Sequence, residues 1–189
     1  MTTWTPLPLV LALGLTGCAA GPDRFAVIPP EPAAAETRQR IAFRAVEIRE
    51  LSLPAYAAAD EIALQGVDGT LTTQGTLWAD SPPRAVALEL ARALAQTTGA
   101  RIASDPWPFE ALPDASLDVR FERFVAEEGG AFRASGQYFV AVLDGRRERS
   151  GFFDLAVPFD PALGLPAIAR ARGQIIADLA VFLARDGLR

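Results

Sequence analysis

The sequence predicts one α+β domain, in which a mainly antiparallel sheet of about four to six strands carries two amphipathic helices on one face. Two turn signals between β-forming segments predict the sheet. Two stretches with apolar residues at every third or fourth position predict the helices. The expected order is strands, a helix, three strands and a final helix.

The first strands come from the segment that follows a proline-rich region. Residues 41–48 are rich in β-formers and predict the first strand, which the proline of 53–56 ends. Asp68-Gly69 lies between segments 61–65 and 70–73 and predicts a hairpin, because glycine adopts positive φ without steric penalty.

A meander follows in the second half. Residues 117–122 alternate between apolar and polar, which is typical of a half-buried strand, and the alternation slips at Arg123-Phe124, which indicates a bulge. Glu128-Gly129-Gly130 and Asp144-Gly145 predict the turns that join the next two strands. Within 138–143 both faces are apolar. Helices on one side and a loop on the other would explain this, and so would a lipid pocket or an oligomer interface.

Two helices are expected. Ser81-Pro82-Pro83 predicts the start of the first, with Ser81 as the N-cap, and Gly99 predicts its end. Pro158 and Pro161 precede the second. Their apolar faces consist of Val86, Leu90 and Leu94, and of Ile168, Ala171, Ile175, Leu179, Phe182 and Leu183.

The N-terminus has the features of an export signal. Residues 1–17 carry no charged side chain and contain a leucine-rich stretch that is too short to span about 30 Å of hydrocarbon. Leu15-Thr16-Gly17-Cys18 resembles the lipobox of bacterial lipoproteins. The resemblance implies cleavage between Gly17 and Cys18 and attachment of three acyl chains to Cys18, and the alternative is a buried structural cysteine. Ala19 implies the periplasmic face of the outer membrane as the destination.

Residues 18–40 form the expected tether between the anchor and a single globular domain at 41–189. Prolines at 22, 29, 30 and 32 favour extended backbone. At ~3.3 Å per residue such a tether reaches up to roughly 65 Å.

The composition argues against several functions. The net charge is −5, so no broad basic face is available for nucleic acid. There is no histidine, which removes the usual general acid–base residue and the commonest metal ligand. Cys18 is the one cysteine, so no disulfide within the chain and no cysteine cluster for zinc is expected. We expect neither catalysis nor a metal nor a cofactor beyond the acyl chains.

Three aromatic residues in or beside predicted loops, Tyr56, Trp78 and Trp107, are the candidates for binding a partner. The alternative for each is that it packs under its loop and closes the core.

Four segments resemble the ABC-type transport auxiliary lipoproteins of the PqiC/YmbA group. They are Leu53-Pro54-Ala55-Tyr56, Glu61-Ile62-Ala63-Leu64, Trp78-Ala79-Asp80-Ser81-Pro82 and Asp144-Gly145-Arg146. The resemblance implies a non-catalytic outer-membrane subunit that docks a periplasm-spanning MCE protein for lipid transport, and a homo-oligomer. The alternative is a periplasmic lipid-binding or outer-membrane-assembly lipoprotein.

Overall fold

The computed structural model describes residues 21–27, 30, 38–143 and 145–189. The predicted signal, Gly17, Cys18 and Asp144 lie outside these residues. Within the described residues no helix is long and apolar enough to cross a membrane.

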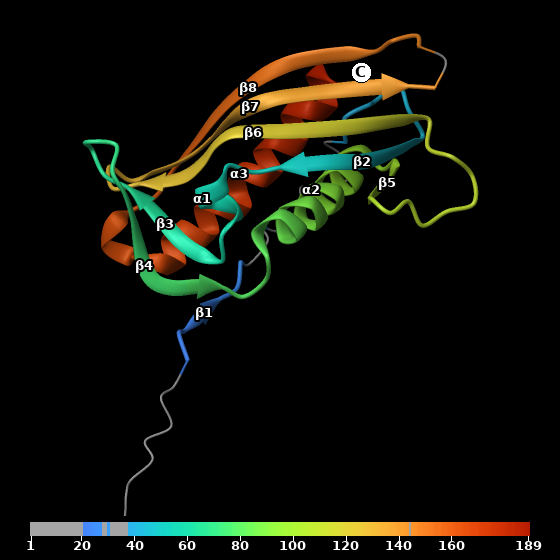
Figure 1. Ribbon diagram of the computed structural model, residues 1–189. Coiled ribbons are helices and arrows are strands. Elements are labelled where there is room, and N and C mark those ends of the chain that lie inside the picture. Colours follow the sequence, from blue (N-terminus) through green and yellow to red (C-terminus); the bar gives the residue numbers. More distant parts are fainter. Residues whose placement is uncertain (1–20, 28–29, 31–37, 144) are drawn as a thin grey trace, which may run out of the picture.

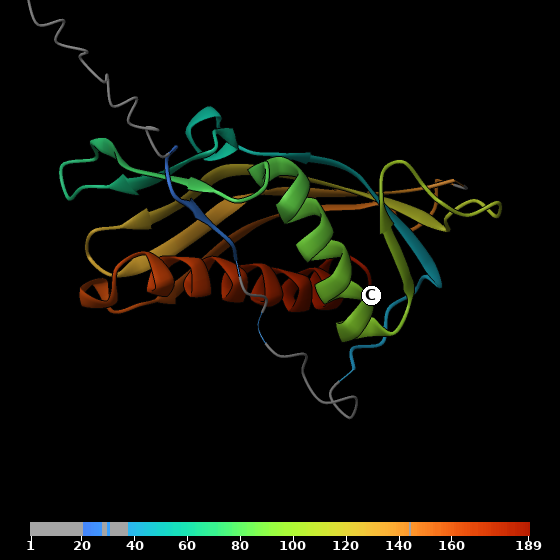
Figure 2. The same cartoon turned by 90° about the horizontal axis from the view of Figure 1, so that it is seen from below.

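The α+β class is confirmed, but the sheet is larger than predicted. It has eight strands among the described residues, and it curls around two long helices (Figures 1 and 2). The strands are β1 (Arg24–Phe25), β2 (Ala45–Ser52), β3 (Glu61–Gln65), β4 (Leu71–Trp78), β5 (Arg101–Ser104), β6 (Ala115–Glu127), β7 (Ala131–Val142) and β8 (Arg149–Pro158). The helices are α1 (Ala55–Ala58), α2 (Pro82–Thr98) and α3 (Leu165–Asp186), with a short 3-10 turn, η2 (Pro161–Leu163).

The pairing is mixed. The predicted hairpin β3–β4 and the meander β6–β7–β8 are antiparallel. β6 also pairs in parallel with β2 and with β3, while β2 pairs in parallel with β5, and β1 with β4. These parallel pairings join the hairpin and the meander into one sheet, which turn signals alone do not predict.

β2 and β3 lie end to end along the same edge of β6. β2 pairs as far as Ser52 with Arg120, and β3 resumes the ladder at Leu64 with Ala126. The proline-containing segment between them forms the short helix α1 in place of a strand. The ladder on this edge of β6 is therefore interrupted at residues 121–125.

The first long strand begins later than predicted. The sequence indicates 41–48, whereas β2 spans Ala45–Ser52. The N–H of Ala42 donates to the carbonyl of Leu188 at 2.7 Å, and the N–H groups of Arg44 and Ala45 donate to the carboxylate of Asp114 at 2.7 and 3.0 Å. These bonds occupy the N–H groups of Ala42 and Arg44 with the end of α3 and with a loop, so residues before Ala45 do not continue the strand.

Both predicted helices are confirmed, and they lie on one face of the sheet (Figure 2). Ser81 occupies the N-cap position of α2 but makes no side-chain cap bond. Pro83 at the second helical position has no N–H, so one of the two main-chain donors that an N-cap side chain ordinarily accepts from is missing. Gly99 ends α2 with φ +71°.

The predicted bulge is present in the β6–β7 ladder, between Phe121 and Arg123. Gly136 lies opposite, and a Cβ on it would meet the carbonyl oxygen of Arg120 at 2.1 Å. The two strands thus approach too closely at this point for any other residue.

β1 lies within the segment that the sequence assigns to the tether. Arg24 pairs with Leu77 and Phe25 with Trp78, so this part of the segment belongs to the sheet. Arg24 follows Cys18 by six residues. At ~3.3–3.6 Å per residue, Cys18 can lie no farther than about 20 Å from β1.

Candidate functional site

The first candidate site is built around a buried arginine of α3. Position 172 belongs to the apolar face of this helix, between Ile168 and Ile175, and the Arg172 side chain is 3% exposed. Its Cζ lies 4.6 Å from the ring centroid of Trp78, and its Nη2 lies 3.4 Å from Oε1 of Glu89 on α2. The cation is thus held between an indole face and a carboxylate. We call Trp78, Glu89 and Arg172 the Arg172 cluster.

The Arg172 cluster contains polar atoms without hydrogen-bond partners. Nε and Nη2 of Arg172 and Oε2 of Glu89 are buried; among the described residues, the two nitrogens donate no hydrogen bond and the oxygen accepts none. Burial raises the pKa of Glu89, and the charge of Arg172 opposes this shift. Burial lowers the pKa of Arg172, and Glu89 opposes it. The two charges therefore compensate each other only in part, as is common for ion pairs removed from water.

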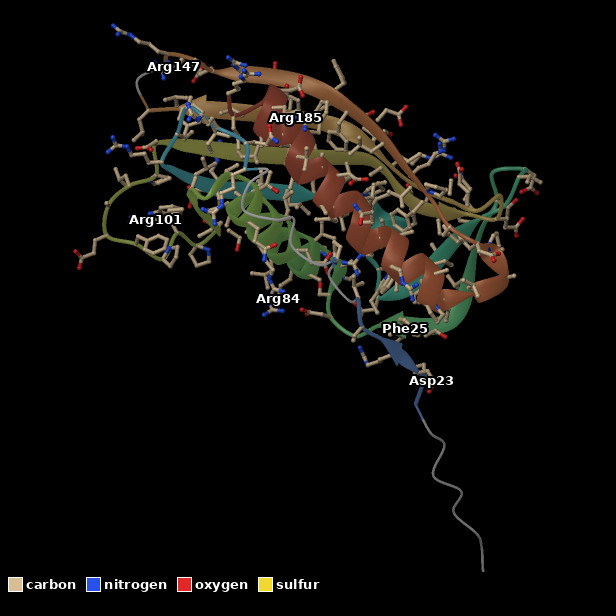
Figure 3. The ribbon with its side chains drawn as sticks, turned by 180° about the vertical axis from the view of Figure 1, so that it is seen from behind. Asp23, Phe25, Arg84, Arg101, Arg147 and Arg185 are labelled. Carbon is tan, nitrogen blue, oxygen red and sulfur yellow. The ribbon has the colours of Figure 1, made fainter. Side chains whose placement is uncertain are left out.

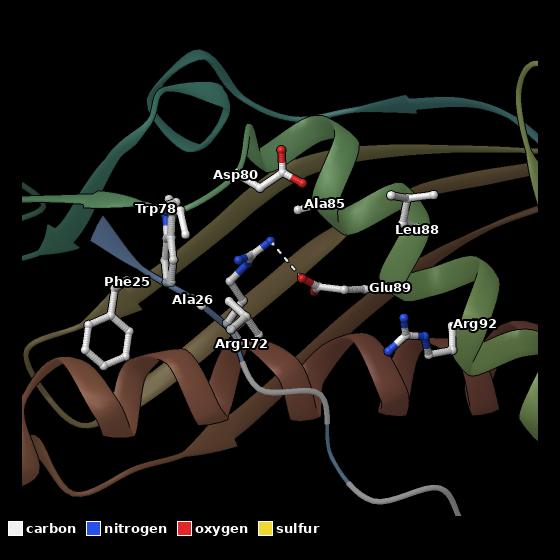
Figure 4. Close-up of a pocket in the computed structure, with 11 residues that line it drawn as sticks. Phe25, Ala26, Trp78, Asp80, Ala85, Leu88, Glu89, Arg92 and Arg172 are labelled. Carbon is white, nitrogen blue, oxygen red and sulfur yellow. Dashed lines mark ion pairs between the residues drawn. The ribbon is translucent and has the colours of Figure 1, made fainter. Parts of the chain in front are cut away.

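A pocket of about 330 Å³ opens beside the Arg172 cluster. Figure 4 shows the ion pair between Arg172 and Glu89, with Trp78 and Phe25 on one side of it and Leu88 and Arg92 of α2 on the other. β1 supplies one wall, because Phe25 and the two residues after it line the pocket. The lining is mainly apolar, and its charged groups are Asp80, Glu89, Arg92 and Arg172.

Tyr56 lies at the interruption of the β6 ladder. Its hydroxyl accepts a hydrogen bond of 3.3 Å from the N–H of Phe124, where β6 has no strand neighbour on that edge. Tyr56 and Trp78 line a small cavity of about 20 Å³, so the structure brings these two candidates together. Tyr56 is half-buried, whereas Trp78 is only 7% exposed and belongs to the core.

Trp107 lies apart from them, in the loop between β5 and β6. Its Nε1–H donates to the carbonyl of Ala111 at 2.7 Å, and its ring meets that of Phe109 edge to face at 5.0 Å. The same loop carries Leu112, which is 72% exposed. The loop thus holds an ordered aromatic pair next to an exposed apolar side chain.

The exposed leucine of this loop adjoins the end of β7. Leu112 and Pro113 line a hollow of about 250 Å³ together with Ala141 and Leu143, and Leu143 is 78% exposed. We call Leu112 and Leu143 the distal patch. The loop and the end of the doubly apolar segment 138–143 thus share this hollow, and Leu143, the last residue of the segment, stays open to solvent.

The distal patch and β1 lie at different ends of the molecule. Figure 3 labels Phe25 on β1 and Asp23 just before it, and shows Arg101, the first residue of β5, and Arg147, between β7 and β8, on the opposite side. Figure 1 gives the same arrangement. A chain held through its N-terminus therefore presents the distal patch away from its attachment point.

Sequence reasoning missed Arg172, Glu89 and Leu112. The signal for Arg172 was present, because a charged residue spaced four after Ile168 and three before Ile175 interrupts an otherwise apolar helix face. Glu89 lies beside Leu90 of the apolar face of α2, which is a weaker indication of a buried charge. Nothing in the sequence indicated that Leu112 stays exposed. In the part of the chain that the structure describes, no group of three or more His, Cys, Asp or Glu is placed to hold a metal ion.

The mixed sheet with two helices on one face defines an α+β module. The chain belongs to the family of ABC-type transport auxiliary lipoprotein components, whose model matches residues 26–184. No curated protein matches the sequence.

Two solved structures share the fold. One, described as an uncharacterized protein, is 17% identical, with a TM-score of 0.67 over 88% of this chain and 98% of its own. The other, a Xanthomonas campestris protein of the family DUF330, is 19% identical, with a TM-score of 0.61 over 88% of this chain and 93% of its own.

Proposed function

We propose that the chain is the lipid-anchored outer-membrane subunit of an MCE-type ABC transport system and docks the periplasm-spanning MCE protein there. Membership of the auxiliary lipoprotein family over residues 26–184 is the observation that carries this proposal. The subunit acts through surface contacts, without catalysis, and its one covalent addition is the set of acyl chains on Cys18.

The anchor is the first part of the proposal. Three acyl chains exceed the two membrane signals that stable attachment requires. The test is incorporation of labelled palmitate into the wild type and the Cys18→Ala variant in cells. Label on the wild type alone supports the anchor, whereas label that survives the substitution contradicts it.

The distal patch is the proposed contact for the MCE protein. β1 holds one end of the domain within about 20 Å of Cys18, so the opposite end is directed away from the outer membrane and toward a partner that spans the periplasm. Leu112 and Leu143 are 72% and 78% exposed there. Large exposed apolar side chains next to a hollow are typical of protein contacts.

Capture of a purified MCE protein from the same cells tests the docking surface. We expect Leu112→Asp with Leu143→Asp to weaken capture by at least about tenfold, because charges enter an apolar contact. The matched control is Val67→Asp, which alters a residue that is 94% exposed at the β3–β4 turn. Equal capture by the wild type, the double variant and the control would contradict the distal patch as the docking surface.

The aromatic candidates enter the same assay. Tyr56 and Trp78 line a common cavity and Trp78 pairs with Phe25 of β1, so Tyr56→Ala and Trp78→Ala test a second contact away from the distal patch, and we expect each to weaken capture if that contact is used. We expect Trp107→Ala to weaken capture through the loop that carries Leu112. Since Trp78 is core, Trp78→Phe is the better variant, because it keeps most of the buried ring. Unchanged capture with both Tyr56 and Trp78 altered would contradict a docking role for this pair.

A lipid-binding lipoprotein is the second candidate function. The unpaired polar atoms of the Arg172 cluster, next to a mainly apolar pocket, are the observation that favours it.

A further inference from the structure

The pocket beside the Arg172 cluster has the chemistry of a site for a ligand that carries both charges. Among the described residues, Nε and Nη2 of Arg172 donate no hydrogen bond, although Nη2 lies 3.4 Å from Oε1 of Glu89 in the ion pair, and Oε2 of Glu89 accepts none. Buried groups of this kind cost free energy unless something binds them. These three atoms are closed to water, so a ligand reaches them only when the two side chains turn toward the pocket. One ligand that satisfies all three must present an anionic oxygen and an N–H donor.

The other charged groups that line the pocket agree with a zwitterion. Arg92 is exposed at the pocket rim. Asp80 is already engaged, by Arg84 and by the N–H of Ser81. Two guanidinium groups and two carboxylates thus line the pocket, and the carboxylate of Glu89 beside Arg172 opposes a simple anion.

The shape and position of the pocket narrow the ligand further. Its volume of about 330 Å³ lies at the lower end of the range for small-molecule sites, roughly 300–1,000 Å³. Phe25, Val27 and Leu88 provide apolar surface beside the charged groups. Phe25 belongs to β1, which lies within about 20 Å of Cys18 along the chain. An anchored domain therefore holds this pocket close to a bilayer surface.

We propose that the Arg172 pocket binds the headgroup of a phospholipid that has a primary ammonium, with its phosphate on Arg172 and Arg92 and its ammonium on Glu89. Trp78 lies over the guanidinium and keeps it in place for the phosphate. The glycerol end rests on Phe25, Val27 and Leu88. This inference rests on the proposed attachment at a bilayer, and it adds a lipid contact to the docking role.

Native mass spectrometry of the full chain in detergent micelles tests the site. The probes are phosphatidylethanolamine, and phosphatidylcholine, whose quaternary ammonium has no N–H to give to Glu89. We expect the wild type to retain phosphatidylethanolamine and to retain phosphatidylcholine at least about tenfold less, a difference of about 1.4 kcal/mol. Equal retention of both lipids would overturn the assignment of Glu89.

Three variants test the residues. Arg172→Met keeps the apolar stem without its N–H groups, Glu89→Gln removes the charge, and Arg170→Gln is the control, since Arg170 is exposed on the same helix outside the pocket. We expect the first two to lower phosphatidylethanolamine retention about tenfold and the control to change nothing. Retention by Arg172→Met at the wild-type level would overturn the proposal.

Folding and competing ligands are covered by two further measurements. Arg172→Met leaves Glu89 without its ion-pair partner, so the double variant Arg172→Met with Glu89→Gln is measured beside it. Circular dichroism establishes that both variants fold. A folded double variant that still retains the lipid contradicts the site. Displacement of the lipid by inorganic phosphate alone, or by a blocked dipeptide, assigns the pocket to a free anion or to a peptide and overturns the headgroup.

The outcome is separable from that of the proposed function. Capture of the MCE protein by Arg172→Met, with lipid retention lost, supports both proposals. If Arg172→Met captures the MCE protein and also retains the lipid as the wild type does, the headgroup site alone is contradicted. Lipid retention without capture of the MCE protein by the wild type contradicts the docking proposal alone.

Discussion

The hydroxyl of Tyr56 accepts a hydrogen bond from the main-chain N–H of Phe124 at the point where β6 lacks a strand neighbour. β2 ends its pairing at Arg120, and β3 resumes it at Ala126. A side chain from α1 therefore takes the place of a strand carbonyl. This gives Tyr56 a structural role that is independent of any partner.

Tyr56→Phe is expected to lower the free energy of unfolding by about 1 kcal/mol, because a partly buried N–H loses its acceptor while the ring stays in place. Chemical denaturation of the two proteins measures the difference. The same variant separates the two roles of Tyr56, since a docking contact made by the ring survives the loss of the hydroxyl. Equal stability of Tyr56→Phe and wild type would show that water satisfies this N–H.

Gly136→Ala tests the close approach of β6 and β7 at the bulge. The added Cβ would lie 2.1 Å from the carbonyl oxygen of Arg120 and 2.9 Å from Cα of Phe121, so the backbone must move. We expect a loss of stability of at least about 2 kcal/mol, measured as a shift of the thermal midpoint.

Gly129→Ala is the matched control. This glycine lies in the turn before β7, and a Cβ on it would meet nothing within 4 Å. Its expected effect stays within about 0.5 kcal/mol. Similar losses in the two variants would contradict the close approach of β6 and β7 as the cause of the loss at 136.

The bulge also illustrates what the sequence can and cannot predict. Local signals predicted it well, because the slip at Arg123-Phe124 is a break in a period of two, and the turns at Asp68-Gly69 and Glu128-Gly129-Gly130 were equally explicit. The hairpin, the meander and both long helices followed from such signals and are confirmed.

Contacts between segments far apart in the chain have no local sequence signal of this kind. The parallel pairings of β2 and β3 with β6 join segments far apart in the chain, and parallel strands need no turn signal. β1 has two residues, too few for any period to show, and it lies in a proline-rich segment. For the candidate site, the sequence suggested Trp78 but not the arginine that packs on it, since the cost of burying Arg172 is visible only when its neighbours are known.

The pH dependence of stability tests the burial of Glu89. Burial raises its pKa above the ordinary glutamate value of 4.5. Between 4.5 and the raised pKa, the folded protein holds more protons on this group than the unfolded chain, so this group's contribution to stability falls as the pH rises through that window.

Glu89→Gln has no ionisable side chain at position 89, so comparing it with the wild type isolates the contribution of Glu89 to the pH dependence of stability. The free energy of unfolding of wild type minus that of Glu89→Gln is expected to decrease from pH 4.5 upward and to level off once Glu89 is ionised in the folded state. Urea denaturation of both proteins over this range gives the difference. A difference that rises with pH would mean that Arg172 outweighs burial.

The free edge of β8 predicts self-association. Among the described residues, β8 pairs only with β7, which leaves the other edge of a strand of ten residues without a neighbour. Phe152 lies in this strand and is 75% exposed. Long edges with exposed apolar residues are typical places for a second copy to pair.

Phe152→Asp is therefore expected to shift the full chain in detergent from a homo-oligomer toward the monomer, because it places a charge beside the pairing edge. Light scattering coupled to size exclusion measures the mass of each species. Leu163→Asp is the control, since Leu163 is 62% exposed in η2, outside the strands. If both variants keep the mass of the wild type, β8 is not the contact. A wild type that is already monomeric at high concentration would instead contradict self-association itself, and would leave the MCE protein as the partner that covers the exposed apolar residues.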